Sequence, residues 1–295
     1  MHEGRMTWEP GWTWYRVEGE LRADGPAPLV LLHGGPGAAH DYLEPLAVLA
    51  ETAGRPCVLY DQLGCGLSQH LPDAPSGFWT VELFRRELDE LIAHLGIAGR
   101  YHVLGQSWGG MLGMEHALEH PPGLRSLVIA NSPASMKLWI SETGRLRSQL
   151  PDDVQQTLTR HEQAGSTDSE EYKEAVLEFY RRHLCRVPFP EGLERSLAQI
   201  DEDPTVYETM NGPSEFHVTG SLADWDVTPR LGGIQVPCLV VSGEFDEATP
   251  DLVRPLVQAI PGARWELFEG ASHSTHLEQP ERFLALVESF LAAND

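Results

Sequence analysis

One serine in this chain lies in a pattern that can make its hydroxyl a nucleophile. The segment Gly-Gln-Ser-Trp-Gly at 105–109 places Ser107 between an apolar run at 101–104 and a helical pattern at 111–118. A serine on such a strand-to-helix turn sits in a strained conformation that lifts its hydroxyl away from the sheet, and a Cβ on either flank would crowd the turn. A serine hydroxyl attacks a carbonyl only when a base takes its proton. The spacing therefore predicts acyl-transfer chemistry with a base and an acid elsewhere in the chain.

The acid and the base are expected after the serine, in that order along the chain. Asp246, on the loop after the apolar run 237–241, is the preferred acid. His273, between the last predicted strand and the final helix, is the preferred base ahead of His276. His273 would take the Ser107 proton and return it to the leaving amine, while Asp246 would hold the imidazole tautomer. The alternative acids are Glu244, Glu247 and Asp226.

Negative charge that develops on the attacked carbonyl needs preorganised backbone donors. The loop His-Gly-Gly-Pro-Gly at 33–37 directly follows the first predicted buried strand. In a fold with this type of serine turn, one donor is the N–H after the nucleophile and the other comes from such an early loop. The sequence therefore predicts an oxyanion hole made by the N–H groups of Trp108 and Gly35.

The elements that must position these groups alternate along the chain. Short runs predicted to be strands, several of them continuously apolar, are separated by helical patterns, which is typical of parallel strands joined by crossover helices. The alternation stops after residue 132 and resumes at 237, with charge-rich helical segments between. The sequence thus predicts an α/β-hydrolase fold with a mostly parallel sheet, a core at 1–132 and 225–295, and a helical cap inserted at 133–224. The predicted strands are 28–32, 57–60, 101–104, 127–130, 237–241 and 264–268, and the clearest helices are 79–95, 111–118, 170–184, one from about 250, and 280–293.

Composition narrows the possible partners. The 295 residues carry a net charge of −23, which argues against binding to a phosphate backbone, and an acidic site entrance would attract cationic substrates. The first 21 residues lack the apolar stretch of a signal peptide and no apolar run is long enough to span a membrane, so a cytoplasmic location is expected. No motif implies a metal or a cofactor. The four cysteines, which form no Cys-x-x-Cys pair, are predicted to be reduced and structural: Cys57, Cys65, Cys185 and Cys238.

Taken together, these motifs resemble the prolyl aminopeptidase (proline iminopeptidase) family of α/β-hydrolases. The loop at 33–37, the segment Asp-Gln-Leu-Gly-Cys-Gly-Leu-Ser at 61–68 and the serine turn at 105–110 are similar to that family's hallmark segments. The segment Met-Asn-Gly-Pro-Ser-Glu-Phe at 210–216, with 219–220 and 224–226 after it, resembles the tricorn-interacting subgroup. So does Gly-Glu-Phe-Asp-Glu-Ala-Thr-Pro at 243–250.

This resemblance implies residues for substrate binding that the spacing does not supply. In the subgroup, glutamates beside the catalytic centre bind the free amine of the substrate, and the matching positions are Glu215 and Glu247. A buried or half-buried carboxylate strongly prefers a cationic partner. Glu244 is a third, weaker candidate. Four aromatic residues are expected either to line a flat pocket for a pyrrolidine ring or to pack in the core: Trp108, Phe216, Tyr207 and Trp225.

The resemblance implies a Ser-His-Asp aminopeptidase that releases an N-terminal residue, preferably proline, from short peptides through an acyl-enzyme. The alternative is an amidase or esterase acting on small L-amino acid amides or esters such as prolinamide, because the catalytic and amine-binding groups would be the same. A scaffold without catalysis is disfavoured, since serine, acid and base candidates are all present. An epoxide hydrolase or dehalogenase would need a carboxylate where Ser107 stands.

Overall fold

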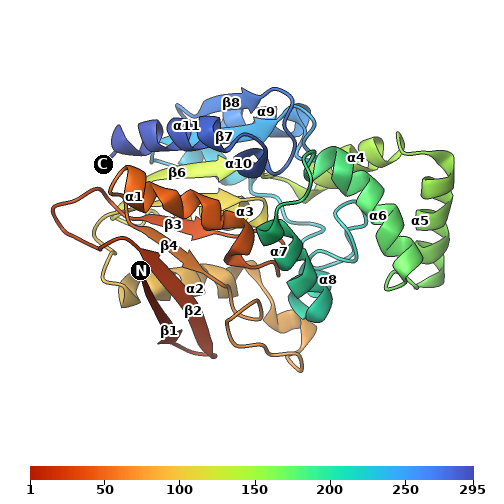
Figure 1. Cartoon of the computed structure of the whole chain (residues 1–295), viewed down its shortest axis with the longest axis horizontal. Helices are drawn as coiled ribbons and strands as arrows, with labels where there is room; N and C mark the ends of the chain where they lie inside the picture. Colours follow the sequence, from red (N-terminus) through yellow and green to blue (C-terminus); the bar gives the residue numbers. More distant parts are fainter.

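The computed structural model describes residues 1–295 and contains one eight-stranded sheet with helices on both faces (Figure 1). The strands lie in the order β1-β2-β4-β3-β5-β6-β7-β8. Strands β3 to β8 are parallel, whereas β1 pairs with β2, and β2 with β4, in antiparallel fashion. This arrangement confirms the predicted α/β-hydrolase fold. The strands are β1 His2–Thr7, β2 Trp12–Glu18, β3 Leu29–Leu32, β4 Cys57–Tyr60, β5 Tyr101–Gln106, β6 Leu124–Ala130, β7 Cys238–Gly243 and β8 Arg264–Phe268.

The antiparallel hairpin of β1 and β2 was not predicted. Its residues mix charged and apolar types, as in β2, where Arg16 and Glu18 alternate with the buried Tyr15 and Val17. Such alternation is typical of a strand near a sheet edge with one solvated face, and it differs from the continuous apolar runs of the central strands. The other six strands agree with the predicted runs to within three residues at each end.

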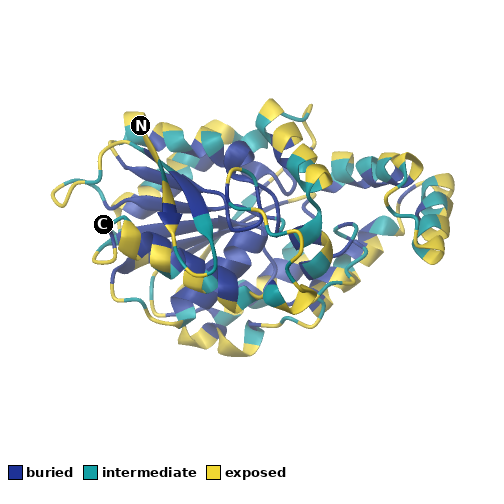
Figure 2. Ribbon diagram, turned by 90° about the horizontal axis from the view of Figure 1, so that it is seen from below, coloured by how far each residue is buried: buried dark blue, intermediate teal, exposed yellow.

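Two apolar layers, one on each face of the sheet, fix the helices around it. Successive strand residues face opposite sides, so Leu29 and Leu31 pack with α11 while Val30 and Leu32 pack with α2 and α3. Figure 2 shows the strands as a buried interior beneath helices whose outer faces are exposed. The helical elements of this core are η1 His40–Val48, α1 Leu49–Thr52, η2 Ser76–Phe78, α2 Val81–His94, α3 Trp108–Leu118, η3 Thr228–Gly233, α9 Pro250–Ala259, α10 Thr275–Glu278 and α11 Pro280–Ala292.

An insertion of five helices follows β6 and precedes β7. Its two ends meet, because the N–H of Met136 donates to the carbonyl of Trp225 and the N–H of Val227 donates to the carbonyl of Ala134, both at 2.9 Å. Helices α5 and α6 project away from the sheet, while α7 packs on η1 near the strand ends (Figure 1). The inserted helices are α4 Met136–Arg147, α5 Asp152–Ala164, α6 Glu170–His183, α7 Glu191–Glu202 and α8 Thr205–Met210.

The outer part of the insertion has a small apolar core of its own. Leu158 from α5 and Phe179 from α6 are fully buried in it, and Phe216 packs edge-on against Phe179 with ring centroids 4.9 Å apart. The insertion therefore holds its shape partly through its own contacts and partly through the sheet.

None of the helices in the chain combines the length and the apolar composition that crossing a bilayer requires. All four cysteines are buried and free, in agreement with their predicted structural role.

Candidate active site

Ser107 occupies the turn between β5 and α3, in a backbone conformation that L-residues rarely adopt. Its φ is 55° and its ψ is −123°. A Cβ at Gly105 would overlap the carbonyl of Gly109, and a Cβ at Gly109 would overlap the carbonyl of Leu32. The turn is anchored to the neighbouring strand, since the Ser107 N–H donates to the carbonyl of Ala130 at 2.9 Å. Only glycines on both flanks allow this turn, which holds the serine above the end of the sheet.

His273 and Asp246 form a buried pair, and His273 lines the same cavity as Ser107. The Nδ1 of His273 lies 2.7 Å from Oδ1 of Asp246, and these residues are 2% and 1% exposed. Asp246 accepts three further hydrogen bonds, from the N–H of Ala248 at 2.8 Å, the N–H of Gly243 at 3.2 Å and the amide of Asn131 at 2.6 Å. A carboxylate surrounded by four donors can hold the Nδ1–H tautomer of the imidazole, which leaves Nε2 free to accept a proton.

The loop at 33–37 lies beside the serine and supplies backbone donors. Gly35 has a φ of 108°, and a Cβ there would overlap the N–H of Gly37. Trp108 is the first residue of α3, so its N–H has no partner within the helix. These two N–H groups are the candidates for stabilising an oxyanion. The loop is fixed by Gln62, whose side-chain amide donates to the carbonyl of His33 at 3.1 Å.

A chain of hydrogen bonds connects the loop at 33–37 to His273. The N–H of Gly34 donates to the Tyr42 hydroxyl at 2.6 Å, and this hydroxyl donates to Oε1 of Gln106 at 2.7 Å. The amide of Gln106 then donates to the carbonyl of His273 at 3.1 Å. The loop, the serine turn and the histidine are thus connected through buried side chains.

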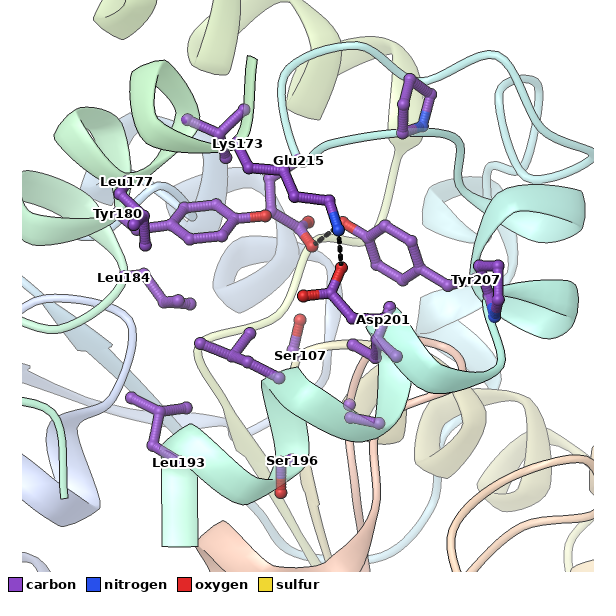
Figure 3. Close-up of a pocket in the computed structure, with 18 of the residues that line it drawn as sticks. Ser107, Lys173, Leu177, Tyr180, Leu184, Leu193, Ser196, Asp201, Tyr207 and Glu215 are labelled. Carbon is purple, nitrogen blue, oxygen red and sulfur yellow. Dashed lines mark hydrogen bonds and ion pairs between the residues drawn. The ribbon is translucent and has the colours of Figure 1, made fainter. Parts of the chain in front are cut away.

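These groups open into a cavity of about 330 Å³ that also contains two glutamates. Glu247 is fully buried, neither of its carboxylate oxygens has a hydrogen-bond partner, and Oε1 lies 3.5 Å from Nε2 of His273. Glu215 is half-buried and accepts a hydrogen bond from the Tyr207 hydroxyl at 2.6 Å. In Figure 3 the Glu215 carboxylate lies between the rings of Tyr180 and Tyr207, with Ser107 below it. The arrangement places two carboxyl groups with no Lys or Arg partner in the cavity that Ser107 lines, where a bound cation would favour their ionised forms.

The carboxylates around His273 change the proton affinity of its imidazole. Burial alone would lower the pKa of His273, but Glu247 and then Asp246 outweigh burial and raise this pKa to about 9. Burial raises the pKa of Glu247 well above its ordinary range, and the nearby Glu215 adds to this while His273 opposes it. Burial also raises the pKa of Glu215, against the opposing hydrogen bond from Tyr207.

The outer wall of the cavity comes from the inserted helices. Leu177 lies on α6, Leu184 directly follows that helix and Leu193 lies on α7. All three side chains line the space in front of Ser107 (Figure 3). At the rim, Nζ of Lys173 lies 2.8 Å from Oδ1 of Asp201, which joins α6 to α7. The cavity is therefore acidic at its inner end and apolar along one wall.

Comparison with known proteins shows to which family this chain belongs. Residues 27–280 match the model of the alpha/beta hydrolase fold family. The chain is 37% identical to the proline iminopeptidase of Lactobacillus helveticus (strain DPC 4571), over 99% of this chain and 98% of that one, and 37% identical to that of Clostridium botulinum (strain Hall), over 99% of each. This chain belongs to the proline iminopeptidase family of α/β hydrolases.

Two crystal structures are similar to this family member over its full length. The structure of VinJ is 52% identical with a TM-score of 0.97, covering 100% of this chain and 99% of that one. The structure of the Mycobacterium smegmatis proline iminopeptidase is 51% identical with a TM-score of 0.91, covering 99% and 98%. The similarity includes the inserted helices as well as the core.

In this family member, three of the alternatives to the preferred acid and base lie elsewhere, and the fourth, Glu247, lies at Nε2 of His273, whereas Asp246 lies at Nδ1. Glu244 is exposed and accepts the N–H of Gly270 at 2.8 Å, and Asp226 accepts hydrogen bonds from Thr228 and Ser135. The Nε2–H of His276 donates to the carbonyl of Tyr42 at 3.0 Å, and burial lowers the pKa of His276 to about 4. The residues that the fold brings around one cavity are Ser107, His273, Gly35, Glu215 and Glu247, with Asp246 behind the histidine and Trp108 after the serine.

Three of the four aromatic residues considered for the pocket do not line this cavity. The Trp108 indole points into the core and donates to Gln62 at 2.8 Å, Phe216 packs within the insertion, and the Trp225 indole donates to Glu115 at 2.9 Å. Only Tyr207 faces the cavity. Core packing therefore accounts for the other three, because each has a buried apolar or hydrogen-bonded environment away from the serine.

Sequence reasoning missed several side chains that shape the site. Gln106, Tyr42 and Asn131 connect the loop, the turn and the acid through the hydrogen bonds given above. For two of them the position in the sequence could have served as a signal: Gln106 directly precedes the serine, and Asn131 directly follows β6. Tyr42 had no such signal, because its hydroxyl reaches the site only through the fold of η1.

Proposed function

We propose that this protein is a serine aminopeptidase that releases an N-terminal residue, preferably proline, from short peptides. The observation that carries the proposal is the unpaired, buried Glu247 beside Ser107 and His273 in one cavity. Family membership supports it, since full-length relatives at 37% identity are proline iminopeptidases. The tricorn-interacting subgroup is proposed as the finer placement, on the segments at 210–216 and 243–250.

The catalytic roles follow from the geometry. Ser107 attacks the carbonyl of the first residue while His273 Nε2 takes the hydroxyl proton, and Asp246 holds the imidazole and stabilises its cation. The N–H groups of Gly35 and Trp108 hold the oxyanion. His273 then gives its proton to the leaving amine, and a water molecule activated by the same histidine hydrolyses the acyl-enzyme.

The exopeptidase character comes from the amine site and the cap. Glu215 and Glu247 take the protonated N-terminal amine, which places the first carbonyl at the serine and leaves no room for a residue before it. We assign this blocking role to the helical cap at 133–224, whose helices form the outer wall of the cavity. The partner is thus a small peptide or amino acid amide with a free amine.

A substrate panel tests this function. Proline 2-naphthylamide, alanine 2-naphthylamide, N-acetylproline 2-naphthylamide, prolinamide and proline-initiated peptides of two to six residues are assayed for kcat/KM. We expect the highest value for substrates with free N-terminal proline and at least a hundredfold lower value for the N-acetylated form. Turnover of prolinamide without turnover of any peptide would instead favour the amidase or esterase function. Equal rates with and without the free amine would contradict the proposal.

Glu215→Gln should separate binding of the amine from the chemistry. The glutamine oxygen can still accept the Tyr207 hydroxyl, so the local structure is kept. Removing one charge of a buried ion pair typically costs about 2–5 kcal/mol, so KM for proline 2-naphthylamide should rise by roughly two orders of magnitude. Hydrolysis of p-nitrophenyl acetate, which has no amine, should change little. A variant that loses both activities to the same extent would rule out an amine-binding role for Glu215.

A further inference from the structure

We propose that Glu247 holds the catalytic histidine in its protonated, inactive form in the free enzyme, and that the ammonium group of the substrate releases it. The free amine would then be required for the chemical step as well as for binding. This inference rests on the proposed aminopeptidase function and assigns Glu247 a role in specificity beyond that of an anchor.

The argument begins with the atom that must accept the serine proton. Asp246 occupies Nδ1 of His273 at 2.7 Å, so Nε2 is the only nitrogen available to act as the base. Oε1 of Glu247 lies 3.5 Å from that same Nε2. Both oxygens of Glu247 are otherwise without a hydrogen-bond partner, and the side chain has no contact with solvent. In the free enzyme, the closest group that can serve as a cationic partner for this carboxylate is His273, when its Nε2 carries a proton.

The other groups packed around His273 do not supply a competing positive charge. Its main-chain N–H donates to the carbonyl of His183 on α6, and the ring of Trp139 on α4 lies edge-on with its centroid 5.8 Å away. Burial lowers the pKa of His183, and it lowers the pKa of His276 on α10 to about 4, so both are neutral near pH 7. The acidic neighbours are Asp246, Glu247 and Glu215, and the neutral hydroxyls nearby are those of Ser107, Tyr180 and Tyr207. Burial raises the pKa of Glu247, and only a proton on His273 opposes this, so the ionised Glu247 and the protonated His273 favour each other as a pair.

The neighbouring carboxylates favour the protonated form of His273. These carboxylates raise the pKa of His273 to about 9, with Glu247 as the largest of the raising influences, so the imidazole is mostly protonated at pH 7. A protonated Nε2 cannot take the proton of Ser107. Because one pKa unit corresponds to a factor of about ten in the neutral fraction, a substrate that leaves Glu247 free meets only a small fraction of active enzyme at neutral pH.

A substrate with a free amine shifts the protonation equilibrium of His273 toward the neutral imidazole, and no further reactant is needed. Its ammonium group pairs with Glu215 and Glu247, removes their pull on the imidazolium and repels it, so the Nε2 proton leaves to the solvent. One N–H bond breaks at His273, one proton appears in water, and the imidazole becomes a base. By linkage, binding of the ammonium form and protonation of His273 oppose each other.

The decisive variant is Glu247→Gln, assayed at pH 7 on two substrates. Turnover of p-nitrophenyl acetate, which has no amine, should increase about tenfold, because loss of the carboxylate lowers the pKa of His273. The pH at half-maximal ester rate should also move down from its alkaline value in the parent enzyme. Turnover of proline 2-naphthylamide should fall, because the anchor is lost.

The control is Glu269→Gln, which makes the same change at an exposed position four residues before His273 and should alter neither rate. A folded Glu247→Gln protein, judged by an unchanged circular dichroism spectrum, whose ester rate is unchanged or lower would overturn the inference and leave the anchor role intact. Failure of the parent enzyme to cleave proline 2-naphthylamide would instead overturn the proposed function itself.

A second measurement does not depend on changing Glu247. Prolinamide is titrated into Ser107→Ala protein at pH 7 by calorimetry, in buffers that differ in their enthalpy of ionisation. We expect release of close to one proton for each ligand bound. Binding with no release of protons would show that His273 is already neutral and would refute the inference, and absence of binding would refute the amine site as well.

Discussion

Replacing Ser107 with alanine lowers kcat for proline 2-naphthylamide by roughly 10⁶-fold, which is the expected cost of removing the nucleophile of a serine hydrolase. No other hydroxyl is positioned on the serine turn between β5 and α3. Alanine tolerates the same backbone conformation about as well as serine does, so the protein should remain folded. A fluorophosphonate probe that labels the parent enzyme should fail to label this variant.

The control for this variant is Ser196→Ala, which removes a buried hydroxyl from the same cavity (Figure 3). That hydroxyl donates to the carbonyl of Ala39 at 3.3 Å and should affect kcat by less than about threefold. Turnover by the Ser107→Ala protein above one per cent of the parent rate would refute the mechanism.

Asp246→Asn should produce the second largest loss, roughly 10⁴-fold in kcat. All four partners of this carboxylate are donors: the Nδ1–H of His273, the N–H groups of Ala248 and Gly243, and the amide of Asn131. An amide group must turn its own NH₂ toward at least one of them. The imidazole then loses the tautomer that leaves Nε2 free, while KM should change much less than kcat.

Asp226→Asn tests the same assignment from the other side. Asp226 was an alternative acid from the sequence, and it bonds Ser135 and Thr228 at the junction between the core and the insertion. We expect nearly full activity from this variant. Loss of activity in Asp226→Asn with retention in Asp246→Asn would reverse the assignment.

The core elements were predictable because their signals are local. Buried parallel strands such as β3, β4 and β7 read as continuous apolar runs, and α2 shows its buried face at helical spacing. The hairpin of β1 and β2 was missed because an edge strand carries only half of that signal. The insertion was recognisable as helical, but its packing on η1 depends on contacts between residues more than 140 positions apart.

The same distinction between local signals and long-range contacts applies to the candidate active site. The order of serine, acid and histidine along the chain, together with two glycine-rich loops, is enough to single out Ser107, Asp246 and His273 from the sequence, because this fold places those groups at the ends of defined strands. The aromatic pocket could not be judged in the same way. Whether an indole faces a cavity or the core depends on its rotamer and on neighbours distant in sequence, and only Tyr207 of the four candidates faces the cavity.

The sequence by itself determined the strand-to-helix turn at Ser107, the mostly parallel arrangement of the central strands and the family, because each depends on short motifs or local patterns. The tertiary structure alone decided which carboxylates are unpaired. Glu247 and Glu244 are three residues apart on one loop, yet one is fully buried beside Nε2 of His273 and the other is exposed to solvent. In the inference proposed above, burial and distance set the charge of His273, and both arise only when β7, the loop before α10 and the cap meet at the same cavity.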